Sequence, residues 1–88
     1  MKFYCVYILK SDKDENLYTG YTSDLKKRLS QHINGEGTST KFRRPINLIY
    51  FEACLNKYDA IHKEKYLKTT YGKRYIKNRL KNHLNDSN

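Results

Sequence analysis

The chain has 88 residues, 38% of them hydrophobic, and a formal net charge of +9. This length allows one domain with a single core, which we expect over residues 1–88, and it excludes a deeply enclosed site. Any functional site must therefore lie near the surface. The positive charge favours a partner rich in phosphate.

A membrane surface would match the charge equally well, but the sequence argues against a membrane partner. The longest apolar run ends at Leu9 and is too short to span a bilayer, and we recognise no secretory signal or lipidation motif. We therefore expect a soluble cytoplasmic protein. Cys5 and Cys54 stand alone in apolar surroundings, which predicts free buried thiols rather than a disulfide or a zinc site.

The first half of the chain predicts two strands and a helix. Residues 3–10 (FYCVYILK) are rich in aromatic and branched side chains, which is typical of a central strand buried on both faces. The polar turn SDKDEN leads to a second, antiparallel strand over 16–22. Thr22 or Ser23 can cap a helix over 24–33.

The second half predicts one strand and two helices. Residues 38–44 form a basic loop or short helix that Pro45 ends, and the apolar stretch 46–54 is the third strand. A helix over 58–68 follows. The sequence TTYG interrupts the helical pattern, and another helix runs over 73–84.

The first predicted helix carries polar side chains on or beside its apolar face. That face consists of Leu25, Leu29, His32 and Ile33. His32 therefore lies within the apolar stripe, and Arg28 flanks it one turn earlier. Both side chains can face the sheet.

Glu64 lies on the inward stripe of the next helix, which also contains Ala60, Ile61 and Leu67. An unpaired charge against a core is costly, so Glu64 must meet a cation, a hydrogen-bond network or a metal. A structural pair with Arg28 or a neighbouring tyrosine explains the spacing as well as a metal site does.

Tyr7 and Tyr18 stand out among nine tyrosines, most of which we expect to be structural. If Gly20 lies opposite Tyr7 across the first hairpin, the two phenols share one face of the sheet. The missing side chain of Gly20 would then let a phosphate approach the sheet between them.

These residues together resemble the GIY-YIG nuclease family. The matching features are VYI at 6–8, YTG at 18–20, Arg28 ten residues beyond the second tyrosine, His32 one turn later and Glu64 on a following helix. The likeness is to small stand-alone members related to the nuclease domain of the excinuclease C subunit. It implies an α+β fold with a three-stranded antiparallel sheet flanked by helices, and a magnesium-dependent site for phosphodiester cleavage on one face.

The resemblance assigns a role to each matching residue. Tyr7 and Tyr18 match tyrosines that orient or activate the attacking water. For a phenol, whose ordinary pKa is about 10, this role requires a nearby cation or a better base. Arg28 would bind the scissile phosphate, and His32 suits proton transfer. Glu64 would hold one Mg²⁺ or Mn²⁺ that water and phosphate oxygens complete.

The chain departs from the family pattern at two places. Tyr21 stands where some members carry a lysine that helps a phenol to ionise, so Lys41 or the metal has to supply that positive field. Some members also carry an asparagine about one helix beyond the glutamate, where this chain has Ile76, with Asn78 as a nearby substitute. The residues expected to contact nucleic acid are Gly20, Tyr21, Lys41, Arg43 and Arg44.

Two groups of basic residues could hold backbone phosphates on either side of the site, although solvated surface is the alternative for each residue. One group lies in the connection before Pro45 and the other in the last helix. The last helix contributes Lys73, Arg74, Lys77, Arg79 and Lys81.

Two functions follow from these observations. The favoured one is a metal-dependent endonuclease acting on DNA, with branched, flapped or single-stranded structures as candidate substrates and DNA repair as the implied setting. The alternative is a catalytically weak or inactive nucleic-acid-binding module that acts with a protein partner, which could also supply specificity. A ribosome- or membrane-associated basic protein would explain the charge but not the inward Glu64.

Overall fold

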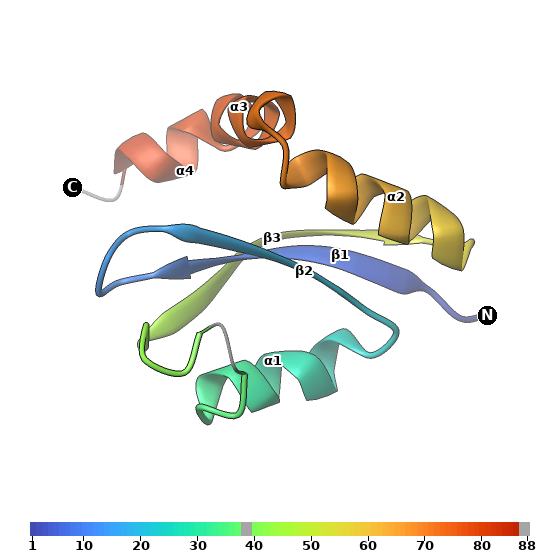
Figure 1. Cartoon of the computed structure of the whole chain (residues 1–88), viewed down its shortest axis with the longest axis horizontal. Coiled ribbons are helices and arrows are strands. Elements are labelled where there is room, and N and C mark those ends of the chain that lie inside the picture. Colours follow the sequence, from blue (N-terminus) through green and yellow to red (C-terminus); the bar gives the residue numbers. More distant parts are fainter. Residues whose placement is uncertain (38–39, 87–88) are drawn as a thin grey trace.

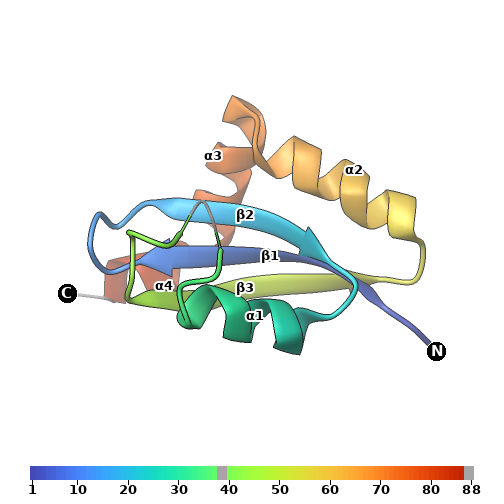
Figure 2. The ribbon, with the colours of Figure 1, turned by 60° about the horizontal axis from the view of Figure 1, so that its bottom comes forward.

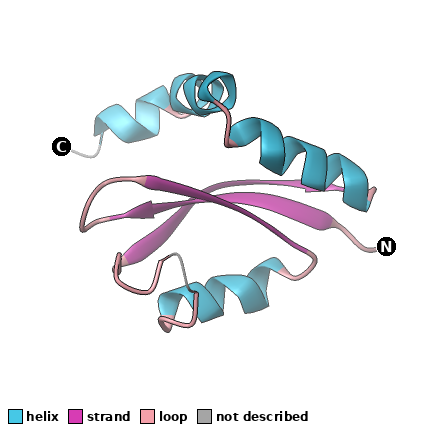
Figure 3. Ribbon diagram, in the orientation of Figure 1, coloured by secondary structure: helices cyan, strands magenta, loops and turns pink. Residues whose placement is uncertain are grey.

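A three-stranded antiparallel sheet forms the middle layer of the computed structural model, which describes residues 1–37 and 40–86 (Figures 1 and 3). The strands are β1 (Tyr4–Ser11), β2 (Leu17–Thr22) and β3 (Ile46–Cys54), in the order β2-β1-β3. The expected α+β class and the central position of the first strand are confirmed. β2 and β3 are the edge strands.

Helices cover both faces of the sheet (Figures 1 and 2). Helix α1 (Leu25–Ile33) lies on one face, whereas α2 (Lys57–Leu67), α3 (Thr70–Arg79) and α4 (Lys81–Asp86) lie on the other. Across the described ranges, no helix is long and apolar enough to cross a membrane.

The two faces of β1 pack into separate clusters because side chains alternate along a strand. Val6 and Ile8 point toward the face that α2 and α3 cover, and Tyr7 and Leu9 point toward α1. The first cluster contains Val6, Ile8, Ala60, Leu67 and Ile76, and the second contains Tyr7, Leu9 and Ile46. Both clusters are small, so each face of the sheet depends on its helices for burial.

The first hairpin has the register that the sequence predicts. Tyr7 pairs with Gly20, and Leu9 pairs with Tyr18. These four residues therefore project to the face that α1 covers, and both phenols lie on the same side of the sheet. Both cysteines are free, as expected; Cys5 is buried, but Cys54 is only partly buried.

Helix α1 begins and ends differently from the prediction. Asp24, rather than Thr22 or Ser23, is the N-cap, and its carboxylate accepts the backbone N–H of Lys27 at 3.1 Å. Thr22 instead accepts the N–H of Asp24. Ile33 was expected on the apolar stripe but is 52% exposed, because the helix ends there and His32 occupies the last inward position.

The predicted last helix is in fact two helices, and its start was placed too late. Thr69 caps α3 by accepting the N–H of Gly72, so the helix already begins within the TTYG segment, and it ends before Leu80. Only glycine fits at position 72 of α3, because a Cβ there would lie 1.9 Å from the carbonyl oxygen of Tyr66. This close approach seats α3 against the end of α2.

Candidate functional site

The five predicted catalytic residues line one open hollow of about 220 Å³ at the β2 edge of the sheet. We call it the edge hollow; it is lined by Tyr7, Leu9, Tyr18, Thr19, Gly20, Tyr21, Arg28, His32, Glu64 and Lys68. β1, β2 and α1 supply most of these side chains. Glu64 and Lys68 come from the end of α2, and they reach the hollow past the outer edge of β2 because no further strand covers that edge.

A buried hydrogen-bond chain runs from Tyr7 through His32 to Thr40. The Tyr7 hydroxyl lies 3.0 Å from Nε2 of His32, and Nδ1 of His32 lies 2.7 Å from Oγ1 of Thr40. The phenol and imidazole rings meet edge to face, with centroids 5.8 Å apart. Both ring nitrogens of His32 therefore have a partner, and the imidazole is fixed in position.

Burial of His32 lowers its pKa below the usual value of 6.5, and the positive charge of Arg28 lowers that pKa further. The imidazole is therefore neutral near pH 7, with one nitrogen that donates and one that accepts. In the tautomer that donates from Nδ1 to Thr40, Nε2 accepts the hydroxyl proton of Tyr7. His32 is thus placed to act as a base toward the Tyr7 hydroxyl.

Tyr18 has a different partner. Its hydroxyl donates to the carboxylate of Asp14 at 2.9 Å, and Arg43 pairs with the same carboxylate at 3.1 Å. The backbone N–H of Asn16, above all, holds the pKa of Asp14 below its usual value. The two phenols therefore differ chemically: Tyr7 faces a base, and Tyr18 faces a carboxylate.

The space that Gly20 leaves is filled by Tyr7. A Cβ at Gly20 would lie 2.3 Å from both Cζ and the hydroxyl oxygen of Tyr7. The expectation that a phosphate enters this gap is therefore wrong, because the phenol ring itself occupies it. Gly20 instead allows the Tyr7 ring to cross the neighbouring strand and reach His32.

Glu64 pairs with Lys68, one helical turn later, with 3.1 Å between Oε2 and Nζ. The expected partners, Arg28 or a tyrosine, are not the ones observed, since Arg28 donates to Gln31 at 3.0 Å. Only 21% of the Glu64 side chain is exposed, against 56% for Lys68. The carboxylate thus lines the edge hollow with the largely exposed ammonium group of Lys68 as its counter-ion.

Lys68 is the cation of the edge hollow that sequence reasoning missed. Lys41, which was expected to supply the positive field, does not line this hollow. The i, i+4 spacing from Glu64 was the available signal for Lys68. Thr40 was also missed, because its contact with His32 depends on the path of the loop after α1.

The basic loop, residues 40–44, lies beside α1 (Figure 1), and its cations Lys41, Arg43 and Arg44 do not line the edge hollow. Arg43 is engaged with Asp14, and Arg44 donates to the carbonyl of Lys41 at 3.3 Å. Binding of nucleic acid by these three side chains stays a prediction. Of the expected loop, residues 38 and 39 lie outside the described residues.

The side chains that line the edge hollow could hold a divalent ion only through a single carboxylate. No three metal-ligating side chains come together within the described ranges, and Glu64 is the one carboxylate that lines the edge hollow. Mg²⁺ usually keeps several waters and takes one or two carboxylates together with substrate phosphates. Glu64 fits such a site if Lys68 turns away. Neither residue considered for the family's asparagine position contributes to the site, because Ile76 is buried in the core and Asn78 does not line the edge hollow.

Comparisons with known proteins identify the family of this chain. Residues 3–76 match the model of the GIY-YIG catalytic domain. The UPF0213 protein CPE1444 of Clostridium perfringens is 52% identical over 64 residues, which cover 72% of this chain and 68% of that protein. The UPF0213 protein SSP2268 of Staphylococcus saprophyticus is 46% identical over 65 residues, which cover 73% of this chain and 78% of that protein.

A solved structure shows the same fold. The solution NMR structure of the UPF0213 protein BH0048 from Bacillus halodurans is similar at a TM-score of 0.53 and 34% identity, and the match covers 86% of this chain and 82% of that one. The chain therefore belongs to the GIY-YIG nuclease family, within the group of small UPF0213 proteins.

Proposed function

We propose that this protein is a metal-dependent endonuclease that hydrolyses phosphodiester bonds in DNA. Family membership supports the nuclease class. The observation that carries the proposal is the Tyr7–His32 hydrogen bond, which opens onto the same hollow as Arg28 and Glu64. A base, a phosphate-binding cation and a carboxylate for a metal thus meet at one place.

In this proposal, Tyr7 and His32 together activate the attacking water. The phenol oxygen accepts a proton from water while its own proton passes to Nε2 of His32, so the phenolate is never free. The water oxygen bonds to phosphorus, the bond to the leaving oxygen breaks, and solvent protonates that oxygen. Thr40 holds the tautomer that leaves Nε2 free to accept.

In the same proposal, Arg28 binds the phosphate and Glu64 holds the metal ion that acts on it. The planar guanidinium of Arg28 binds the scissile group and stabilises the charge that grows in the transition state. Glu64 would hold Mg²⁺ or Mn²⁺, which when bound supplies positive charge at the phosphate and the leaving oxygen. Tyr18 is a positioning residue, since its bond to Asp14 ties the strand to the β1–β2 turn.

Replacement of Glu64 by Gln tests the proposal. Labelled single-stranded, duplex and branched DNA would be incubated with each variant, with and without Mg²⁺ or Mn²⁺. Glu64→Gln should abolish metal-stimulated cleavage but retain DNA binding, whereas Glu36→Gln, the same charge change at an exposed position outside the edge hollow, should retain both. Ion pairs at i, i+4 on a helix contribute only about 0.3–0.5 kcal/mol, so the Tm of Glu64→Gln should change little. Unaltered cleavage by this folded variant would refute the role of Glu64.

A binding module without catalysis is the second candidate, and one observation favours it. Lys68 already neutralises Glu64, which leaves the carboxylate less available to a metal. This alternative predicts tight DNA binding by the unmodified protein without cleavage of any substrate at any metal concentration. A role in DNA repair, a cytoplasmic location and a protein partner stay predictions.

A further inference from the structure

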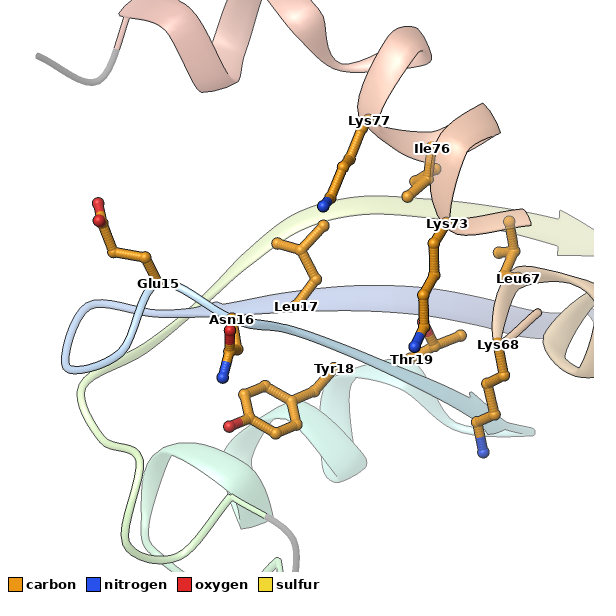
Figure 4. Close-up of a pocket in the computed structure, with 10 residues that line it drawn as sticks. All are labelled: Glu15, Asn16, Leu17, Tyr18, Thr19, Leu67, Lys68, Lys73, Ile76 and Lys77. Atoms are coloured by element: carbon orange, nitrogen blue, oxygen red, sulfur yellow. The ribbon is translucent and has the colours of Figure 1, made fainter. Parts of the chain in front are cut away.

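A second and larger hollow, of about 650 Å³, lies on the other side of β2, between this strand and the helices α2 and α3 (Figure 4). We call it the lysine groove. Leu17, Leu67 and Ile76 form its apolar wall. Lys68, Lys73 and Lys77 line it as well, and Figure 4 shows Lys73 and Lys77 extending from α3 toward β2.

The lysine groove adjoins the edge hollow. Tyr18, Thr19 and Lys68 line both. A chain that leaves the proposed cleavage site can therefore pass around the exposed edge of β2 and enter the groove. The edge permits this passage because β2 has no outer neighbour in the sheet.

The charge of the groove is positive and only partly neutralised. Among the described residues, no acidic partner is found for Lys73 or Lys77. Glu15 lines the far end of the groove, but its carboxylate lies 3.9 Å from Lys10. Lysines one helical turn apart repel each other slightly, so an anionic ligand between them and β2 would relieve this repulsion.

We propose that the lysine groove binds the unpaired strand of a nucleic-acid substrate beside the phosphate that is cleaved, an inference that rests on the proposed function. The ammonium groups of Lys73 and Lys77 hold backbone phosphates, and a base packs against the partly exposed Leu17. The groove has the size of a site for one small organic ligand, which suits a nucleotide.

Base pairing keeps the bases of a duplex from packing in this groove. In a duplex the bases face each other and only their edges are open in the grooves of the helix. An unpaired base instead offers its flat, apolar face to protein side chains. The groove therefore selects flapped, branched or single-stranded substrates over perfectly paired DNA.

The double variant Lys73→Ala/Lys77→Ala tests the groove. Both side chains are exposed and alanine favours a helix, so the variant should fold. The control is Lys26→Ala/Lys57→Ala, which removes the same charge from exposed positions outside both hollows. Fluorescence anisotropy would give the Kd for a single-stranded oligonucleotide and for a duplex at several salt concentrations, without divalent metal.

The groove variant should bind single strands more weakly. The slope of its log binding constant against log salt concentration should be smaller in magnitude by about 1.4, since each of the two lost phosphate contacts on a single strand removes about 0.7. Its duplex binding should match that of the control. Backbone amide signals of Leu17 and Thr19 should also shift in NMR spectra when the single strand is added. Unchanged single-strand binding, or equal losses for both DNA forms, would overturn the inference.

The outcome separates the groove from the proposed cleavage. If the unmodified protein cleaves no substrate but the groove variant loses single-strand binding, the proposed function fails and the groove stands. If cleavage occurs and the groove variant binds single strands normally, the function stands and the groove fails.

Discussion

The buried imidazole of His32 makes the stability of this protein depend on pH. Its pKa in the folded state lies below the ordinary 6.5, mainly because of burial and also because of Arg28. The folded protein thus binds a proton at His32 less readily than the unfolded chain does. The contribution to stability is complete above about pH 6.5 and decreases as the pH falls through that value toward the lower pKa of the folded state.

We therefore expect the free energy of unfolding to decrease as the pH is lowered below about 6.5. Urea unfolding at several pH values measures this slope. His32→Gln should flatten it, whereas His62→Gln, at an exposed position, should leave it unchanged. Cleavage should lose rate at lower pH, where His32 of the folded protein becomes protonated, because protonated His32 cannot accept the Tyr7 proton. An identical slope in His32→Gln would show that other groups cause the pH dependence.

At the residue level, the sequence predicted which side chains meet but not how they pair. Tyr7 and Tyr18 share a face because strand side chains alternate and Gly20 marks the register, and both features are local. The bond from Tyr18 to Asp14 and the bond from His32 to Thr40 depend on how two loops fold back. Loop paths of this kind are not fixed by local periodicity, so these partners could not be predicted.

The boundaries of the strands and helices show the same limit of prediction from local sequence. The strands were predicted to within one residue because their apolar stretches are bounded by polar turns. The break between α3 and α4 was missed, since Ile76, Leu80 and Leu84 continue a helical spacing across it. The early start of α3 was missed because glycine usually ends a helix. Here Gly72 serves the packing of α3 on α2.

The junction of α2 and α3 gives a prediction at this scale. In Gly72→Ala, the new Cβ would meet the carbonyl oxygen of Tyr66, which is backbone and cannot turn away. We expect the free energy of unfolding to fall by about 1–3 kcal/mol, the usual effect of overpacking. The exposed Asn78→Ala in the same helix should change it by less than about 0.5 kcal/mol. Because α3 carries Lys73 and Lys77, Gly72→Ala should also weaken single-strand binding. Equal stability of the two variants would contradict the packing role.

On the scale of the whole molecule, cations lie on both faces of the sheet. The basic loop is on the side of α1, and the lysine groove is on the side of α2 and α3, with the β2 edge between them (Figures 1 and 4). The protein, with its net charge of +9, therefore has two separate basic regions that could bind phosphate. A branched substrate could meet both at once, with its paired arm on the loop and its unpaired strand in the groove.

The loop and the groove should therefore respond to different DNA forms. In Lys41→Ala/Arg44→Ala, the salt slope for duplex binding should fall by about 1.8, since each phosphate contact on a duplex contributes about 0.9. Single-strand binding should stay unchanged. Arg43 is kept in this variant because its ion pair with Asp14 supports the Tyr18 contact, so its loss would disturb the fold as well as the charge. The control is again Lys26→Ala/Lys57→Ala, measured by anisotropy on both DNA forms. Equal weakening on single strands and duplex would mean that the loop acts only through overall charge, and no weakening on duplex would make these residues ordinary solvated surface.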